Sequence, residues 1–255
     1  MNELLKIAQI SDLHIAAGSD AVQEIDVRRN FKQALYSYSV VDSDFIVLSG
    51  DLADHGEKGA YEFVAEEMER CKKPWAWIPG NHDDLENAAN YFSMPDYVHG
   101  KTFDFSMDIK GRRFVFLDNS SGEIQLRQME WIKQQAAEFE LIYLFMHYPP
   151  CLCGHAFMDS KYPMKHIEKV QEAFESISNI GGIFCGHYHC AHSLELKNGI
   201  PVYVAPASPM QISPTSAEFK LESSLPLWQI LNFKGKNLTV EVKNIGISLN
   251  FLHSP

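Results

Sequence analysis

The sequence predicts an α/β protein, a four-layer α/β/β/α sandwich in which two mixed β-sheets are flanked by helices. Two observations predict this class. Apolar runs typical of buried strands are mostly separated by polar, helix-like segments, and other segments alternate around turn residues as antiparallel hairpins do. Together they give more strands than one parallel sheet needs. For 255 residues we expect a single domain over 1–255.

Five apolar runs are near-continuous, which is the pattern of strands buried on both faces. They lie at 4–10, 44–50, 74–80, 141–147 and 181–187. Between the second and third runs, the segment 57–70 carries one apolar helical face. That face consists of Tyr61, Val64, Ala65 and Met68. A strand, a helix and a strand in succession predict right-handed crossovers, and therefore partly parallel sheets.

A second amphipathic helix is predicted in the segment 126–139. Its apolar face would consist of Leu126, Met129, Ile132 and Ala136. Three hairpins are predicted by alternation around short turns that contain glycine. Their turns are Lys110-Gly111, Asn198-Gly199 and Lys234-Gly235. The region 207–255 includes apolar residues at 224–233 that look exposed, so we expect it to form a cap or to contact a second copy in a homodimer.

The net charge is −11, and the 22 Lys and Arg are scattered along the chain. Polyanions would find no basic surface, so we expect neither a nucleic acid polymer nor a membrane as partner. The N-terminal segment lacks the pattern of a signal peptide, and no apolar stretch is long enough for a membrane span; we therefore expect a cytoplasmic protein. The five cysteines are expected to be reduced, with ordinary thiols at Cys151 and Cys153 rather than a metal site or redox pair.

Polar side chains follow the ends of the five apolar runs, where ligands bind in open α/β sheets. The candidate metal ligands are Asp12, His14, Asp51, Asn81, His147, His187 and His189. Mixed carboxylate, imidazole and amide ligands suit Mn, Fe, Zn or Co. One ion cannot use all seven, so we expect two divalent or trivalent transition-metal ions.

The seven ligands divide evenly if Asp51 bridges the two ions. The first ion would then take Asp12, His14 and His189, and the second would take Asn81, His147 and His187. Asn81 would complete the coordination with a neutral oxygen, which adds no charge to a site that must admit an anion. His82 would lie above the metals, within reach of a substrate oxygen, where a proton donor or transition-state stabiliser is needed.

The ligand motifs occur in the order D-x-H, G-D, G-N-H-D, H and G-H-x-H between Asp12 and His189. This order resembles that of the calcineurin-like metallophosphoesterase family, and the strand pattern extends the resemblance over nearly the whole chain. The segments around His147 and His187 are most similar to those of bacterial class III cyclic nucleotide phosphodiesterases and glycerophosphodiesterases. The resemblance implies the metallophosphoesterase fold and a small phosphodiester as substrate.

The family's chemistry implies attack of a metal-bound hydroxide on phosphorus, with His82 protonating or stabilising the leaving oxygen. Asp83 would orient His82 or support the site, and Asp54 would hold a ligand histidine. Relatives commonly carry two histidines where this chain has His147 and Tyr148, so the Tyr148 phenol is expected to alter the substrate pocket. The expected substrate-binding residues are Asn81, His82, Tyr148 and His155.

The leading prediction is a binuclear-metal phosphodiesterase that hydrolyses a 3',5'-cyclic nucleotide or a glycerophosphodiester. One alternative is a phosphomonoesterase or nucleotide pyrophosphatase that uses the same metal site. A more remote alternative is an inactive scaffold of the same fold. The complete set of ligands speaks against a scaffold, because a degenerate site would be expected to lack at least one of them.

Overall fold

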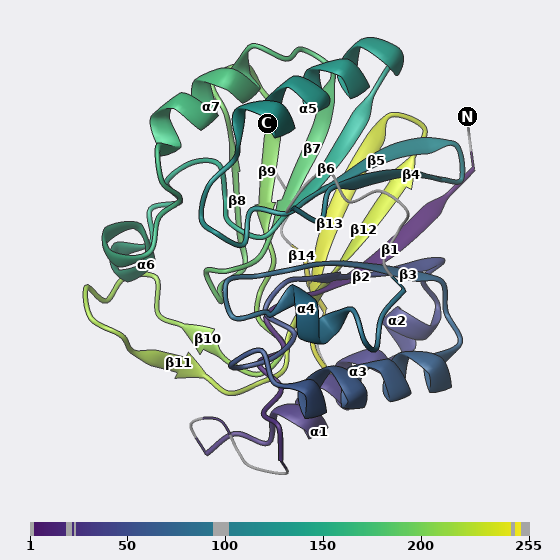
Figure 1. Cartoon of the computed structure of the whole chain (residues 1–255), viewed down its shortest axis with the longest axis vertical. Helices are drawn as coiled ribbons and strands as arrows, with labels where there is room; N and C mark the ends of the chain where they lie inside the picture. Colours follow the sequence, from purple (N-terminus) through teal and green to yellow (C-terminus); the bar gives the residue numbers. More distant parts are fainter. Residues whose placement is uncertain (1–2, 19–21, 23, 94–101, 246–247, 251–255) are drawn as a thin grey trace.

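The computed structural model describes residues 3–18, 22, 24–93, 102–245 and 248–250. Within these residues, two six-stranded sheets pack against each other and helices cover their outer faces (Figure 1). A two-stranded hairpin, β10 (Gln211–Ile212) and β11 (Leu221–Ser223), lies apart from both sheets. This arrangement confirms the predicted sandwich of two mixed sheets flanked by helices.

The first sheet contains strands from both ends of the chain. Its order is β14 (Ser248–Asn250), β13 (Asn237–Lys243), β12 (Trp228–Lys234), β1 (Leu5–Ile10), β2 (Phe45–Ser49) and β3 (Trp75–Ile78). Strands β1, β2 and β3 are parallel, whereas β12 pairs antiparallel with β1. The carboxyl ends of three neighbouring strands therefore lie at one edge of this sheet.

The second sheet has its parallel strands in the centre. Its order is β4 (Phe105–Ile109), β5 (Arg112–Leu117), β6 (Ile142–Met146), β7 (Ile180–Cys185), β9 (Pro201–Val204) and β8 (His192–Glu195). The antiparallel pairs β4–β5 and β8–β9 confirm the hairpins predicted at Lys110-Gly111 and Asn198-Gly199. The hairpin predicted at Lys234-Gly235 joins β12 and β13.

Helices flank each sheet on its outer side (Figure 1). With the first sheet lie α1 (Val27–Leu35), α2 (Tyr38–Val41), α3 (Lys58–Cys71) and α4 (Leu85–Ala88). With the second lie α5 (Leu126–Glu138), α6 (Ala156–Lys161) and α7 (Ile167–Glu175). None of the described helices combines the length and the apolar composition that a membrane crossing requires.

The predicted inner face is correct for α3 and partly wrong for α5. Tyr61, Val64 and Met68 of α3 are buried. In α5, Leu126 is 76% exposed, and Gln128 takes the inward position instead. Gln128 points inward because its amide donates hydrogen bonds of 2.7 Å to a carboxylate oxygen of Asp104 and to the backbone oxygen of Asp118, both of which are buried.

Aromatic side chains fill the space between the two sheets. Phe233 on β12 contacts Phe114, Tyr143 and Phe184 of the second sheet, with ring centroids 5.5, 4.9 and 6.1 Å apart. Edge-to-face contacts of this kind add to the gain from burial and restrict sliding of one sheet over the other. The carboxyl ends of strands from both sheets are thereby held in fixed relation.

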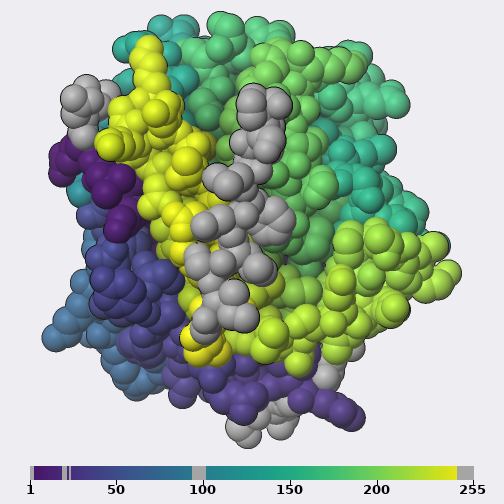
Figure 2. Space-filling view, turned by 180° about the vertical axis from the view of Figure 1, so that it is seen from behind, coloured from purple at the N-terminus to yellow at the C-terminus, as the bar shows by residue number. Residues whose placement is uncertain are grey.

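The C-terminal region differs from the expectation that its apolar residues are exposed. Trp228, Leu231 and Phe233 are fully buried, because β12 pairs with β1 inside the first sheet. Figure 2 shows these C-terminal strands in yellow, between the purple N-terminal strand and the green second sheet. Leu225 remains exposed, at 59%. β12 and β13 are thus part of the main sandwich, and the homodimer stays a prediction.

Candidate metal centre

The structure brings six of the seven predicted ligands together, at the carboxyl ends of strands from both sheets. Asp12 and His14 follow β1, Asp51 follows β2, His147 follows β6, and His187 and His189 follow β7. Three groups of side chains place their ligand atoms within 4.8 Å of one another. They are Asp12, His14 and His189; His14, Asp51 and His82; and Asp51, His147 and His187. Because the groups share His14 and Asp51, they form one cluster.

The backbone turns sharply where these side chains leave the strands. Positive φ angles occur at Asp12 (53°), His14 (45°), Asp51 (51°), His187 (71°) and His189 (49°). This left-handed region is uncommon for residues other than glycine, and such strain concentrates at functional sites. Each turn redirects its side chain from the pleat of the strand toward the edge where the two sheets meet.

Two glycines leave room for the ligands at these turns. A Cβ atom on Gly80 would lie 2.2 Å from Oδ1 of Asp51, and one on Gly50 would lie 2.2 Å from Nδ1 of His147. Contacts this short require the backbone to move. Glycine at these two positions therefore allows the ligand side chains to lie directly against the neighbouring strand ends.

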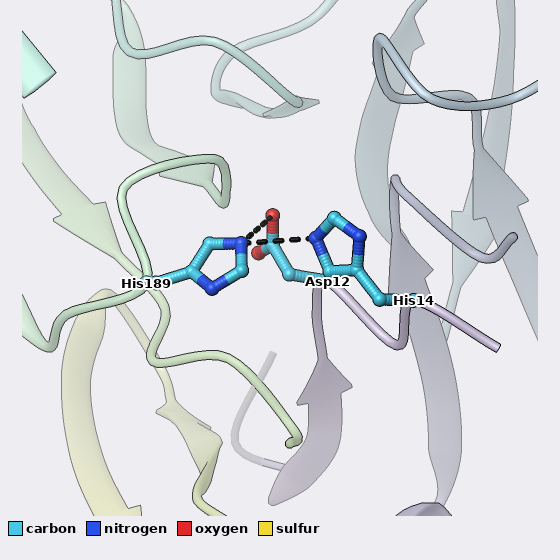
Figure 3. Close-up of side chains that lie close together, drawn as sticks. All are labelled: Asp12, His14 and His189. Carbon is cyan, nitrogen blue, oxygen red and sulfur yellow. Dashed lines mark hydrogen bonds and ion pairs between the residues drawn. The ribbon is translucent and has the colours of Figure 1, made fainter. Parts of the chain in front are cut away.

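The first group contains two imidazole nitrogens and a carboxylate that point at one another (Figure 3). Nε2 of His14 lies 3.0 Å from Nε2 of His189, and Nε2 of His189 lies 3.5 Å from Oδ1 of Asp12. Nδ1 of His14 is 3.1 Å from Oδ1 of Asp54, which fixes the ring and directs Nε2 into the group. Two nitrogens bound at right angles to one ion, each at about 2.1 Å, lie about 3.0 Å apart, so this spacing suits a cation.

The second group surrounds Asp51 on its other side. Nε2 of His147 lies 3.3 Å from Oδ2 of Asp51. Nδ1 of His147 donates to the Ser49 carbonyl at 2.9 Å, and its Nε2 is buried without a hydrogen-bond partner among the described residues. His187 donates from Nε2 to the Tyr162 carbonyl at 3.0 Å, so its Nδ1 is the nitrogen with a free lone pair. Carbonyl contacts of this kind orient metal-binding imidazoles.

Two of the four buried histidines in the cluster hold protons more strongly than a free imidazole. Burial alone would lower the pKa of His147, but the charge of Asp51 outweighs it and raises the pKa to about 9. Burial likewise opposes protonation of His14, but the hydrogen bond that its Nδ1 donates to Asp54 outweighs burial, so this pKa is raised too. Burial works to raise the pKa of Asp51, yet the charge of His147 holds it well below its usual range.

The other two histidines are neutral. Burial lowers the pKa of His187 to about 3, and the charge of His147 adds to this effect. Burial and the charge of His14 keep the pKa of His189 well below its usual value. Neutral imidazoles next to ionised carboxylates are ligands that transition-metal ions bind well, and such ions would take the place of the protons on His147 and His14. The donor set therefore fits cations.

His82 lies at the solvent side of the cluster. Its backbone N–H donates to Oδ1 of Asp51 at 2.8 Å, and its ring stands edge-on to that of His14, with centroids 4.8 Å apart. Nδ1 contacts the backbone carbonyl of Asp54 at 2.6 Å, which leaves Nε2 for other partners. Asn81 is exposed at the same turn; the three groups comprise only histidines and aspartates, and the role of Asn81 as a ligand stays a prediction.

Asp83 does not orient the His82 ring, because its carboxylate faces another way. It accepts hydrogen bonds from the backbone N–H groups of Leu52 and Gly80 and from the hydroxyl of Tyr61. Burial raises the pKa of Asp83 to about 6 although these N–H groups favour its charged form. Asp83 thus ties the end of β2 to the end of β3, and the carbonyl of Asp54 holds the ring instead.

The two further substrate-binding candidates lie in different surroundings. The Tyr148 ring packs on that of His187 with centroids 3.8 Å apart, beside the cluster, and burial raises its pKa to about 12. His155 is 1% exposed and caps α6 by accepting the Met158 N–H on Nδ1. His155 therefore lies inside the protein, and its role in substrate binding stays a prediction.

Asn119, which was not among the predicted site residues, supports the site from the end of β5. Its Oδ1 accepts the backbone N–H groups of His147 at 2.8 Å and Tyr148 at 3.2 Å. Its amide donates to the Tyr148 carbonyl at 3.0 Å. Asn119 thus fixes the turn that carries one predicted ligand. The strand-end rule that found the ligands would have found it too, because it follows the apolar strand "RRFVFL".

Comparison with known proteins gives consistent matches over most of the chain. A "Probable cyclic nucleotide phosphodiesterase" of Fibrobacter succinogenes is 43% identical over 236 residues, which is 92% of this chain and 91% of the relative. A "Probable glycerophosphodiester phosphodiesterase" of Arcobacter nitrofigilis is 25% identical over 85% of each chain. A dimetal phosphatase of Danio rerio shares the fold, with a TM-score of 0.68 at 13% identity, over 98% of this chain and 99% of that one.

The family model that matches is described as "Calcineurin-like phosphoesterase" and covers residues 5–191. This span begins at β1 and ends just beyond His189, so it contains every residue of the cluster. The family match therefore covers the same strand ends that carry the clustered side chains. The chain belongs to the calcineurin-like phosphoesterase family.

Proposed function

We propose that the chain is a binuclear-metal phosphodiesterase that hydrolyses a small phosphodiester. The observation that supports this proposal is that Asp51 lies between two histidine-carboxylate groups, with Nε2 of His14 at 3.7 Å and Nε2 of His147 at 3.3 Å from its Oδ2. The first ion would be held by Asp12, His14 and His189, and the second by Asn81, His147 and His187. The predicted set of ligands is thereby used in full.

The two cations, when bound, supply positive charge to the phosphoryl oxygens and activate water as the nucleophile. The chain's own residues hold the substrate and move the proton. His82 donates Nδ1–H to the Asp54 carbonyl, so a proton on Nε2 is free to pass to the leaving oxygen. Asp83 fixes the turn that contains His82, because its carboxylate accepts the backbone N–H of Gly80 in that turn and the backbone N–H of Leu52 after β2.

A 3',5'-cyclic nucleotide is the first candidate substrate, because the relative with 43% identity carries that name. A glycerophosphodiester is the second, from the name of the Arcobacter relative. A diester needs room for organic groups on both sides of phosphorus. Asn81 is exposed on one side of the cluster, and Tyr162, 52% exposed, lies on the other side, where its carbonyl contacts His187. Exposed residues on both flanks of the cluster support access for such a substrate.

The test compares bis(p-nitrophenyl) phosphate with p-nitrophenyl phosphate, using metal-stripped protein with and without added Mn²⁺. We expect faster cleavage of the diester and dependence on the metal. The experiment then extends to cyclic AMP and glycerophosphocholine, because nitrophenol leaves too easily to report substrate choice. Preference for the monoester would contradict the proposal and favour a phosphatase. Bound metal without any turnover would favour a scaffold.

A further inference from the structure

A cavity of about 510 Å³ lies at the edge of the sheets opposite the metal cluster. Its walls are the β4–β5 turn, the β12–β13 turn and the segment that enters β6. Leu141 lines the cavity just before β6, and His147 follows the other end of that strand. At about 3.3 Å per residue, the two sites are about 20 Å apart. The volume is that of a site for a small organic molecule.

Arg112 supplies a buried positive charge to this cavity. The residue is 5% exposed, and its Nη2 donates to the backbone oxygens of Glu3 at 3.1 Å and Gly235 at 3.4 Å. Its Nη1 is buried and has no hydrogen-bond partner among the described residues. Leaving a buried guanidinium nitrogen without a hydrogen bond costs free energy. A ligand that accepts a hydrogen bond from Nη1 would remove this cost.

The other charges around the cavity are already paired. Arg113 lies 3.1 Å from a carboxylate oxygen of Asp108, and Lys236 lies 2.8 Å from one of Glu140. Within the described part of the chain, no carboxylate lies within ion-pair distance of Arg112. The cavity therefore has one uncompensated positive charge, in a protein whose net charge is −11. This charge favours an anion.

The remaining wall combines one hydroxyl with apolar surface. Tyr143 lines the cavity beside Arg112, is 2% exposed, and forms no hydrogen bond through its hydroxyl among the described residues. The guanidinium of Arg113 stacks on the ring of Phe139, with its central carbon 3.8 Å from the ring centroid. Leu141 completes the apolar side. A guanidinium and a phenol are donors for an oxyanion, and the apolar wall suits a ring or an alkyl group.

We propose that this cavity is a second binding site, separate from the metal centre, for a small organic oxyanion. The oxyanion is a carboxylate or phosphate that accepts hydrogen bonds from Nη1 of Arg112 and the hydroxyl of Tyr143. The apolar part of the molecule packs on Leu141 and Phe139. The ligand, rather than a side chain of the fold, neutralises Arg112.

Binding is tested on the metal-loaded full chain with 4-bromobenzoate as the probe and 4-bromobenzamide as its neutral counterpart. Ligand-observed NMR gives the affinities, and anomalous scattering from bromine in soaked crystals locates the probe. We expect one bromobenzoate beside Arg112 and at least about tenfold weaker binding of the amide, the size of a lost charged hydrogen bond. Arg112→Met should abolish the preference for the carboxylate.

Two further variants separate this site from a general effect of charge. Lys236→Met removes a cation from the rim that is already paired, and should leave bromobenzoate binding unchanged. Tyr143→Phe keeps the ring and removes one donor, and should weaken binding several-fold even if Arg112→Met fails to fold. Equal affinity for the two probes, bromine located only at the metal centre, or carboxylate binding that survives both Arg112→Met and Tyr143→Phe would overturn the proposal.

Discussion

The two ends of the parallel strands differ in how they are built. At the carboxyl ends of β1, β2 and β7, five residues other than glycine have positive φ angles, and charged side chains are buried against one another. At the amino ends, turns that contain glycine join the hairpins, Lys72 and Lys110 also have positive φ angles, and charges form partly exposed pairs such as Lys110 with Asp44. Strained backbone is retained where it positions side chains for function.

This difference predicts that substitutions at the two ends have different consequences. The contacts of Phe233 with Phe114 and Tyr143 join the two sheets nearer their amino ends, where Phe233 pairs with Leu5. Changes at the carboxyl ends should therefore lower metal binding and turnover, and changes at the amino ends should affect mainly the free energy of unfolding. Four pairs of variants test this separation.

The largest effect is expected for Asp51→Asn, which removes the charge shared by both groups of ligands. We expect fewer than two ions per chain by mass spectrometry and a fall in kcat/KM for bis(p-nitrophenyl) phosphate of about 10³-fold or more. The matched control is Asp108→Asn at the opposite end, where the carboxylate is 55% exposed and paired with Arg113. Two bound ions and full turnover in Asp51→Asn would contradict the proposed bridge.

The second effect concerns His82, which lies beside the cluster and contacts the Asp54 carbonyl. His82→Ala should keep both ions and lower kcat by about 10²- to 10³-fold on a substrate with a poor leaving group, since a proton donor is lost. The loss should be smaller for nitrophenyl esters, whose leaving groups need no proton. His55→Ala is the control, because that ring lies 6.3 Å from His82 and its side chain is 76% exposed. An unchanged kcat with the poor leaving group would refute the role.

A third pair uses glycine at both ends. Gly80→Ala would place a Cβ 2.2 Å from the Asp51 carboxylate, so we expect about tenfold lower kcat/KM and about 1–3 kcal/mol lower stability. Gly199→Ala meets no atom within 4 Å and suffers only from its φ of 84°. It should lower stability by about 1–2 kcal/mol and leave kcat/KM unchanged. Urea unfolding measures the stability of each variant, and steady-state kinetics measures its kcat/KM. An equal fall in kcat/KM for the two variants would contradict the different roles of the two ends.

The elements that the sequence predicted well are those that local patterns determine. The turns Lys110-Gly111 and Asn198-Gly199 form hairpins because the residues themselves favour them. The ligands at the ends of β1, β2 and β7 were predictable because buried parallel strands bring their carboxyl ends together. The positive φ angles of Asp12 and His189 were not, since they depend on contacts between two sheets.

The errors arise where a distant segment decides the outcome. Leu126 has the apolar spacing of an inward-facing residue but is exposed. Gln128 faces inward instead, because its amide donates a hydrogen bond to the buried carboxylate of Asp104. The apolar residues 224–233 looked exposed because the sequence does not reveal that β12 pairs with β1. In each case a tertiary contact overrides the local pattern.

The smallest expected effect is at the amino ends, where Lys110 donates to Asp44 at 2.8 Å. Partial burial works to raise the pKa of Asp44, but the hydrogen bond from Lys110 and the N–H of Lys6 outweigh it and lower the pKa. A lowered pKa stabilises the folded state above the unfolded value near 4, and this gain is lost as the pH falls through the folded value. Lys110→Gln should therefore cost up to about 1 kcal/mol at pH 7 and nothing near pH 2, given solvent screening.

Urea unfolding of Lys110→Gln at several pH values, with and without 1 M NaCl, measures this effect. Salt should shrink the difference from the parent chain, because both side chains are about one-third exposed. Lys236→Gln is the control, since its partner Glu140 is 82% exposed and should contribute nothing measurable. A cost that persists at pH 2 would assign the stabilisation to the contact between Lys110 and the Leu4 carbonyl. The amino ends would then be held by hydrogen bonds to the backbone rather than by ion pairs, and ion pairing would matter only at the carboxyl ends.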